Sequence, residues 1–171
     1  EIGCTLAEIH GSLQLPRWSQ WAPPAEYEPC FARMLGSDFQ QRAGNLPQAA
    51  LHADFGFSNV CLNSNGAGHK LVIVDPLANN FSCPTHLVHG PIYVDLGHFL
   101  ACLQGLVPAR TAIRVHPGRV SLMQERFLAG YRSARQFAFE DDAAFAYARA
   151  IAAAYLQYRI KFNFAAHIAT R

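Results

Sequence analysis

The chain has 171 residues, of which 51% are apolar and only 15% are charged, and its formal net charge is +2. This length suits a single domain, residues 1–171, with a sizeable core, and the composition excludes a disordered chain. The small charge gives no reason to expect nucleic acid or a membrane surface as a partner, and no apolar run approaches the length of a membrane span.

The N-terminal quarter is expected to hold two helices joined by a loop. The sequence "TLAEIHGSL" (5–13) repeats apolar residues at helical spacing, and Pro16 ends that helix. Residues 17–29 have the composition of a loop and carry exposed tryptophans. An apolar stripe then predicts a second helix over residues 29–44, with Pro29 in its first turn.

A small β-region is expected next. The runs "AALH" (49–52) and "NVCL" (59–62) are short and apolar, and "NSNGAG" (63–68) has the residues of a hairpin turn. The sequence "HKLVIVDP" (69–76) predicts a buried strand that folds back beside the preceding one. Residues 78–91 then read as an irregular loop.

Three further helices complete the predicted order. "YVDLGHFLACLQGL" (93–106) turns Leu96, Phe99, Leu100 and Leu103 inward, and residues 119–134 form the next helix. The last helix, 141–166, is rich in alanine and places two aspartates at its positive N-terminal end. The expected class is therefore α+β and mainly α-helical, with a small β-hairpin at its centre.

Carboxylates are scarce in the middle of the chain. Between residues 38 and 125 only Asp54, Asp75 and Asp95 are acidic, and each lies where a predicted strand or helix begins or ends. Asp95 could simply complement a helix dipole, and Asp75 could be an ordinary turn residue. Asp54 is harder to explain structurally, because His52 and Asn59 accompany it in otherwise apolar sequence.

These polar residues are suited to binding a hard cation. A junction of strand and loop can gather a carboxylate and a carboxamide five residues apart, and oxygen ligands suit magnesium. Asp75 can supply a second carboxylate, because the turn at 63–68 brings its strand back beside the first. Asp54 is then free to orient a hydroxyl group and to accept its proton.

The sequence "HADFGFSN" (52–59) resembles the H-x-D-x-x-x-x-N catalytic loop of the protein-kinase-like phosphotransferases, and its spelling is most similar to the aminoglycoside phosphotransferase and choline kinase branch. Three other segments share the resemblance. "LVIVD" ends in an aspartate 21 residues after Asp54, "IYVDLGHFL" resembles the Tyr-x-Asp-Leu helix start, and "LAEIHGSL" is similar to the helix that opens the large lobe.

The resemblance implies a role for each site residue. Asp54 is expected to be the catalytic base, and His52 to anchor the catalytic loop. Asn59 and Asp75 are expected to hold the magnesium ions that bridge the phosphates of ATP, and Asp95 to tie the backbone of the loop from below. The implied activity is ATP- and Mg²⁺-dependent phosphorylation of a hydroxyl group on a small molecule, such as an antibiotic, an amino alcohol or a sugar.

The resemblance covers only the C-terminal lobe of the kinase-like fold. The N-terminal lobe should supply a glycine-rich strand pair and a lysine that contacts the phosphates. Only Lys70 and Lys161 occur, and both follow the catalytic loop. The chain is therefore expected to be a fragment that lacks the N-terminal lobe of the same polypeptide and that is weakly active or inactive by itself.

Two other functions fit parts of the sequence. A kinase-like scaffold that binds a partner without catalysis would keep the fold, although the intact Asp54 and Asn59 argue against it. A metal-binding protein could instead use Cys83, His86 and His89, but no second pair of cysteines or histidines completes a zinc site. The five cysteines include no CxxC and are typical of reduced cysteines in a cytoplasmic protein.

The sequence also allows predictions for several aromatic and histidine residues outside the proposed catalytic and metal-binding residues. Trp18, Trp21 and Tyr27 could stack on an acceptor molecule, but packing against the helix that begins at Pro29 is the simpler expectation. His10 is expected at the surface or at a helix end, as is His69.

Overall fold

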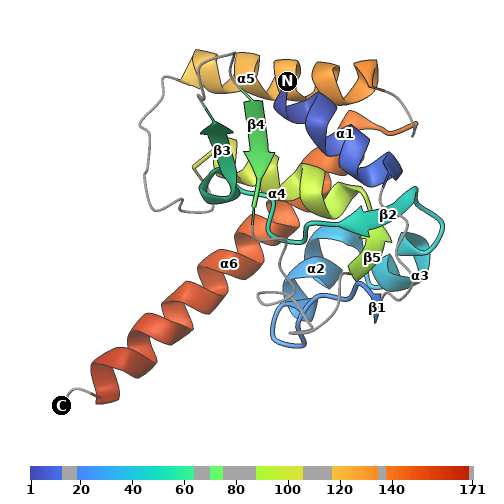
Figure 1. Cartoon of the computed structure of the whole chain (residues 1–171). Helices are drawn as coiled ribbons and strands as arrows, with labels where there is room; N and C mark the ends of the chain where they lie inside the picture. Colours follow the sequence, from blue (N-terminus) through green and yellow to red (C-terminus); the bar gives the residue numbers. More distant parts are fainter. Residues whose placement is uncertain (13–18, 64–69, 75–87, 106–116, 135–137, 170–171) are drawn as a thin grey trace.

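In this computed structural model the described residues are 1–12, 19–63, 70–74, 88–105, 117–134 and 138–169. They form a mainly helical α+β fold (Figure 1). The helices are α1 (Ile2–Ser12), α2 (Glu28–Leu35), α3 (Phe39–Ala43), α4 (Tyr93–Leu103), α5 (Pro117–Ser133) and α6 (Asp141–Ala169). The strands are β1 (Ser19–Gln20), β2 (Gln48–Leu51), β3 (Val60–Asn63), β4 (Lys70–Ile73) and β5 (Val88–Pro91), and a short 3₁₀ helix, η1 (Phe57–Asn59), precedes β3. None of the described helices combines the length and apolar character needed to cross a membrane.

Helix α4 lies at the centre of the molecule. All of its residues are buried, because its sequence is apolar around nearly the whole circumference and other helices surround it. Helix α6 packs against α4 and also against α2, while α1 packs against α5. The four helices predicted at 5–13, 93–106, 119–134 and 141–166 are confirmed, with small shifts at their ends.

Helices α4 and α6 approach each other closely at Gly97. A Cβ atom added there would lie 2.8 Å from the backbone nitrogen of Ala148 and 2.8 Å from the Cβ of Tyr147. Such contacts are too short for carbon, so one of the two helices would have to move. Glycine is therefore the residue that permits this helix pair.

Replacing Gly97 with Ala is expected to destabilise the fold by about 1–3 kcal/mol, because overpacking outweighs the better helix propensity of alanine. Urea denaturation measures the change. Gly44→Ala is the matched control, since the nearest neighbour of its added Cβ is a backbone oxygen at 3.6 Å and its φ of −64° suits alanine. Equal stability of the two variants would contradict the close approach.

The two sheets are small. Strand β5 lies between β1, to which it is parallel, and β2, to which it is antiparallel. Strands β3 and β4 form a separate antiparallel hairpin, in which Val60 pairs with Ile73. The predicted hairpin is thus confirmed, but the prediction that its second strand is buried is wrong, because the residues of β4 are partly or fully exposed.

Strand β5 corrects the predicted loop at 78–91. Residues 88–91 form the central strand of the larger sheet, whereas residues 78–87 lie outside the described residues. The sequence "VHGP" has neither alternation nor length to indicate a strand, and its partners β1 and β2 are far away in the chain. Such pairing is set by tertiary structure.

The single helix predicted at 29–44 is interrupted. Gly36 has a φ of +98° and ends α2, and α3 begins at Phe39. The loop before α2 also differs from expectation, because Trp21 is buried and its ring lies 5.6 Å from the ring of Phe31. The alternative of packing against this helix is therefore correct for Trp21, and Trp18 lies outside the described residues.

Candidate functional site

The loop that follows β2 folds around the carboxylate of Asp95. This aspartate lies in the first turn of α4 and is fully buried. Its Oδ2 accepts a hydrogen bond from the backbone N–H of His52 at 2.7 Å, and its Oδ1 accepts one from Ala53 at 2.8 Å. Ala53 has a φ of +65°, a left-handed conformation that is rare for residues other than glycine. One side chain thus holds two successive amides of a sharply turned backbone.

Asp95 keeps its negative charge despite its burial. Burial raises the pKa of Asp95, but a hydrogen bond from His10 and the nearby imidazoles of His10 and His52 outweigh it and bring the pKa below its usual value of 3.8. The helix-dipole explanation is therefore incomplete, since the carboxylate also accepts hydrogen bonds from the loop.

His10 joins α1 and α5 to this carboxylate. Its Nε2 lies 3.1 Å from Asp95 Oδ2 and its Nδ1 lies 2.8 Å from the hydroxyl of Tyr131. Because the carboxylate can only accept, Nε2–H donates to Asp95, and Nδ1 lies within hydrogen-bond distance of the Tyr131 hydroxyl. The expectation that His10 lies at the surface is wrong, since it is 3% exposed. His69 lies outside the described residues.

His52 connects the loop to the end of β4. Its Nε2 donates to the carbonyl of Val74 at 3.0 Å, and its Nδ1 accepts from the backbone N–H of Asp54 at 3.3 Å. Val74 N–H in turn donates to the carbonyl of Asn59 at 2.9 Å. The end of the strand is therefore fastened to both ends of the loop. Asp75 comes next in the sequence and lies outside the described residues.

The carboxylate of Asp54 is oriented from two sides. The amide of Asn59 donates to the backbone carbonyl of Asp54 at 2.8 Å and to its Oδ2 at 3.2 Å. On the other side, Nδ1 of His98 in α4 lies 3.6 Å from Oδ1. The Asp54 side chain remains 22% exposed, whereas that of His98 is 5% exposed. Asp54 can thus reach a bound molecule while its neighbours hold it in place.

Burial lowers the pKa of His98, and electrostatic repulsion by the nearby His52 lowers it further. The negative charges of Asp54 and Asp95 raise it, but by less than burial lowers it. The net effect places the pKa of His98 below its usual value of 6.5, so its imidazole is neutral at pH 7. On unfolding below pH 6.5 the histidine gains a proton that the folded state resists. By linkage, this residue contributes stability that is complete above pH 6.5 and is lost as the pH falls toward its folded pKa.

The variant His98→Asn is expected to lose less stability than the wild type between pH 7.5 and pH 5.5, because asparagine keeps a polar amide but has no proton to gain. Urea denaturation of both proteins at the two pH values gives the difference. Histidines that do not interact with His98 contribute equally to both proteins and cancel in this comparison. Parallel pH dependences would show that His98 is not the group responsible.

The loop can offer oxygen atoms to magnesium. Since the amide nitrogen of Asn59 donates to Asp54, its carbonyl oxygen is the atom that can face a cation. Among the described residues, no group of three or more His, Cys, Asp or Glu side chains is arranged to hold a metal ion. Magnesium commonly takes only one or two protein ligands together with phosphate and water, so Asn59 with one carboxylate fits such a site.

The structure brings four of the five predicted site residues together: His52, Asp54, Asn59 and Asp95. Sequence analysis missed His10 and His98 as members of this group. The signal for His98 was its position three residues after Asp95 on one helix, which places both side chains on the same face. His10 is the histidine of the "LAEIHGSL" segment, but nothing in that segment shows its partner.

The cysteine and histidine residues of the alternative metal site are only partly described. Cys83 and His86 lie outside the described residues, and His89 lies on β5.

Comparison with protein-family models, with curated proteins and with solved structures finds no match for this chain.

Proposed function

We propose that this chain is the catalytic-loop and acceptor-binding lobe of an ATP- and Mg²⁺-dependent phosphotransferase that acts on a hydroxyl group of a small molecule. The proposal assigns it to the protein-kinase-like fold, in the branch of the aminoglycoside phosphotransferases and choline kinases. The observation that carries it is the meeting of distant motif segments around one loop. His10 and Asp95 are 85 residues apart, yet they share a hydrogen bond directly beneath residues 52 and 53.

This convergence is informative because each motif segment was identified from its own amino-acid sequence, independently of the others. A helix, a loop, a strand end and a second helix start could each match by chance, but chance gives no reason for them to touch. His52 and Asn59 both contact Val74, the residue before Asp75, and Asp95 contacts the loop itself. A phosphotransferase needs such a cluster, since its catalysis depends mainly on positioning and on neutralising charge.

Asp54 is assigned the role of orienting the acceptor hydroxyl and accepting its proton. Its partial exposure lets a substrate approach, and its contacts with Asn59 and His98 limit the directions in which its oxygens can point. An aspartate is a weak base, so holding the hydroxyl in line with the phosphate contributes more than basicity.

Asn59 and Asp75 are assigned to the magnesium ions and the phosphates of ATP. The assignment of Asn59 is supported by the orientation of its amide, and that of Asp75 rests on the sequence resemblance. Bound magnesium would neutralise the charge of the transferred phosphoryl group. A small-molecule acceptor is favoured over a protein substrate because the loop "HADFGFSN" lacks the Arg and Lys typical of protein kinases.

Magnesium-dependent transfer of phosphate from ATP by the full-length natural protein tests the proposal. Release of ADP is measured with choline, a hexose, homoserine and an aminoglycoside as acceptors, with and without Mg²⁺. Transfer to one of them that requires Mg²⁺ would support the proposal. Binding of Mg²⁺–ATP without turnover on any acceptor would favour the scaffold alternative, and failure to bind Mg²⁺–ATP would contradict the phosphotransferase proposal.

A further inference from the structure

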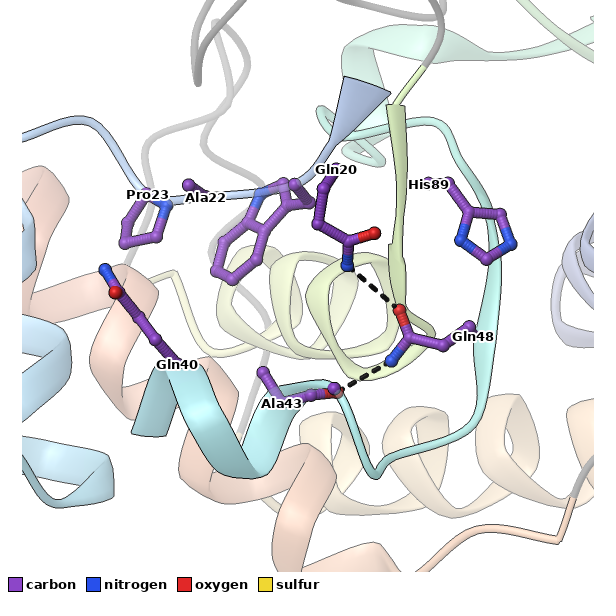
Figure 2. Close-up of a pocket in the computed structure, with 9 residues that line it drawn as sticks. Gln20, Ala22, Pro23, Gln40, Ala43, Gln48 and His89 are labelled. Carbon is purple, nitrogen blue, oxygen red and sulfur yellow. Dashed lines mark hydrogen bonds between the residues drawn. The ribbon is translucent and has the colours of Figure 1, made fainter. Parts of the chain in front are cut away.

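A pocket lies at the start of β2, and none of its lining residues belongs to the loop of residues 52–59 that follows the end of this strand. It has a volume of about 550 Å³, within the range typical of small-molecule sites, and is lined by Gln20, Trp21, Ala22, Pro23, Gln40, Ala43, Gly44, Gln48 and His89. Figure 2 shows Gln20, Gln48 and His89 on one side of this space and Gln40 on the opposite side. The residues come from three strands, from the loop after β1 and from α3 with the residue that follows it, so segments distant in the sequence form the pocket together.

The hydrogen bonds in the wall leave acceptor atoms for a ligand. Gln20 donates from Nε2 to Oε1 of Gln48, and Gln48 donates from Nε2 to the carbonyl of Ala43 (Figure 2). The same Nε2 also donates to the carbonyl of Leu46. Gln40 uses its Nε2 in a bond to Glu28. Both Oε1 and Nε2 of Gln48 are thus occupied, whereas the Oε1 atoms of Gln20 and Gln40 remain as acceptors among the described residues.

Trp21 belongs to the same wall. It is 6% exposed, and its Nε1–H is buried with no acceptor among the described residues. Its ring also contacts Phe31 and Tyr147, which fixes the position of the indole.

The wall carries no formal charge. None of the nine lining residues is Asp, Glu, Lys or Arg, and burial lowers the pKa of His89 from 6.5, so its imidazole is neutral at pH 7. A ligand that suits this wall is therefore neutral and donates hydrogen bonds to amide oxygens. Hydroxyl groups are such donors.

We propose that this pocket binds a neutral polyhydroxyl molecule of the size of a monosaccharide, held by hydrogen bonds to Gln20 and Gln40. The site is separate from the Asp54 loop and does not depend on the phosphotransferase proposal, because binding here needs neither ATP nor magnesium.

Saturation-transfer NMR on the full-length natural protein, without nucleotide, tests this site with glucose, galactose and inositol as neutral probes. Glucosamine and glucose 6-phosphate serve as charged counterparts. The neutral probes are expected to bind with a Kd of about 1 mM, and the charged ones more weakly. Absence of signal from all neutral probes, or stronger binding of a charged counterpart, would overturn the proposal.

Variants locate the binding. Gln20→Leu and Gln40→Leu each remove an amide acceptor, from opposite sides of the pocket. Each is expected to weaken glucose binding about tenfold, whereas Gln41→Leu, on the same helix as Gln40 but outside the pocket lining, leaves it unchanged. If Gln20→Leu unfolds, Gln40→Leu still decides. Unchanged binding in the folded variants would place the sugar elsewhere and overturn the assignment.

Discussion

Replacing Asp54 with Asn is expected to reduce the kcat of phosphoryl transfer by the full-length protein about 10²–10⁴-fold, the range for losing a positioned general base. Asparagine has nearly the same shape and keeps the backbone carbonyl to which Asn59 donates. It cannot accept a proton from the acceptor hydroxyl, and its amide cannot replace both carboxylate oxygens. The change should therefore appear in kcat more than in the KM for ATP.

The matched control for this variant is Asp142→Asn, an exposed aspartate in the first turn of α6. The variant removes the same charge from the protein but lies outside the loop of residues 52–59, so its kcat should equal that of the wild type. Thermal unfolding of both variants checks that the fold is intact. Normal activity of a folded Asp54→Asn protein would remove Asp54 from its proposed role.

Replacing Asp95 with Ala is expected to destabilise the chain by about 3–5 kcal/mol, the cost of removing one partner from a buried charged network. The backbone N–H groups of His52 and Ala53 would lose their acceptor, and so would Nε2 of His10. Asparagine would be a poor substitute, because its amide nitrogen would face one of these donors. Urea denaturation measures the loss.

The exposed aspartate Asp38 provides the comparison for Asp95. It forms an ion pair with Arg42 in which both side chains are more than half exposed, so Asp38→Ala should cost at most about 1 kcal/mol. A loss for Asp95→Ala no greater than that for Asp38→Ala would contradict the structural role of the buried carboxylate. A protein that retained stability yet lost activity would instead limit Asp95 to catalysis.

Local sequence was sufficient to predict the elements whose apolar pattern repeats over several helical turns or over paired strands. The helices α1, α5 and α6 carry apolar residues at regular spacing, and the β3–β4 hairpin has turn residues between two apolar runs. The central strand β5 and the break at Gly36 were not predictable in this way. Strand pairing between β5 and β1 depends on segments almost 70 residues apart, and a glycine inside a helical pattern does not reveal its φ value.

The residues of the candidate site also differ in whether local sequence could identify them. Spacing alone identified His52, Asp54 and Asn59, because all three lie within one short loop. It could not show that His10 and His98 belong with them, since each reaches the loop through the packing of a helix. A buried histidine in an apolar helix has the same local sequence whether it is a core residue or a neighbour of a reactive carboxylate.

The left-handed backbone at Ala53 has a consequence for how the loop acquires its shape. Such a conformation costs alanine about 1–2 kcal/mol relative to the ordinary helical region, so a free peptide with the sequence of residues 52–59 would rarely adopt it. The bond from Ala53 N–H to the distant Asp95 offsets that cost only after α4 has docked. The loop therefore acquires this geometry only together with the packing of α4, and its shape reports whether that helix is in place.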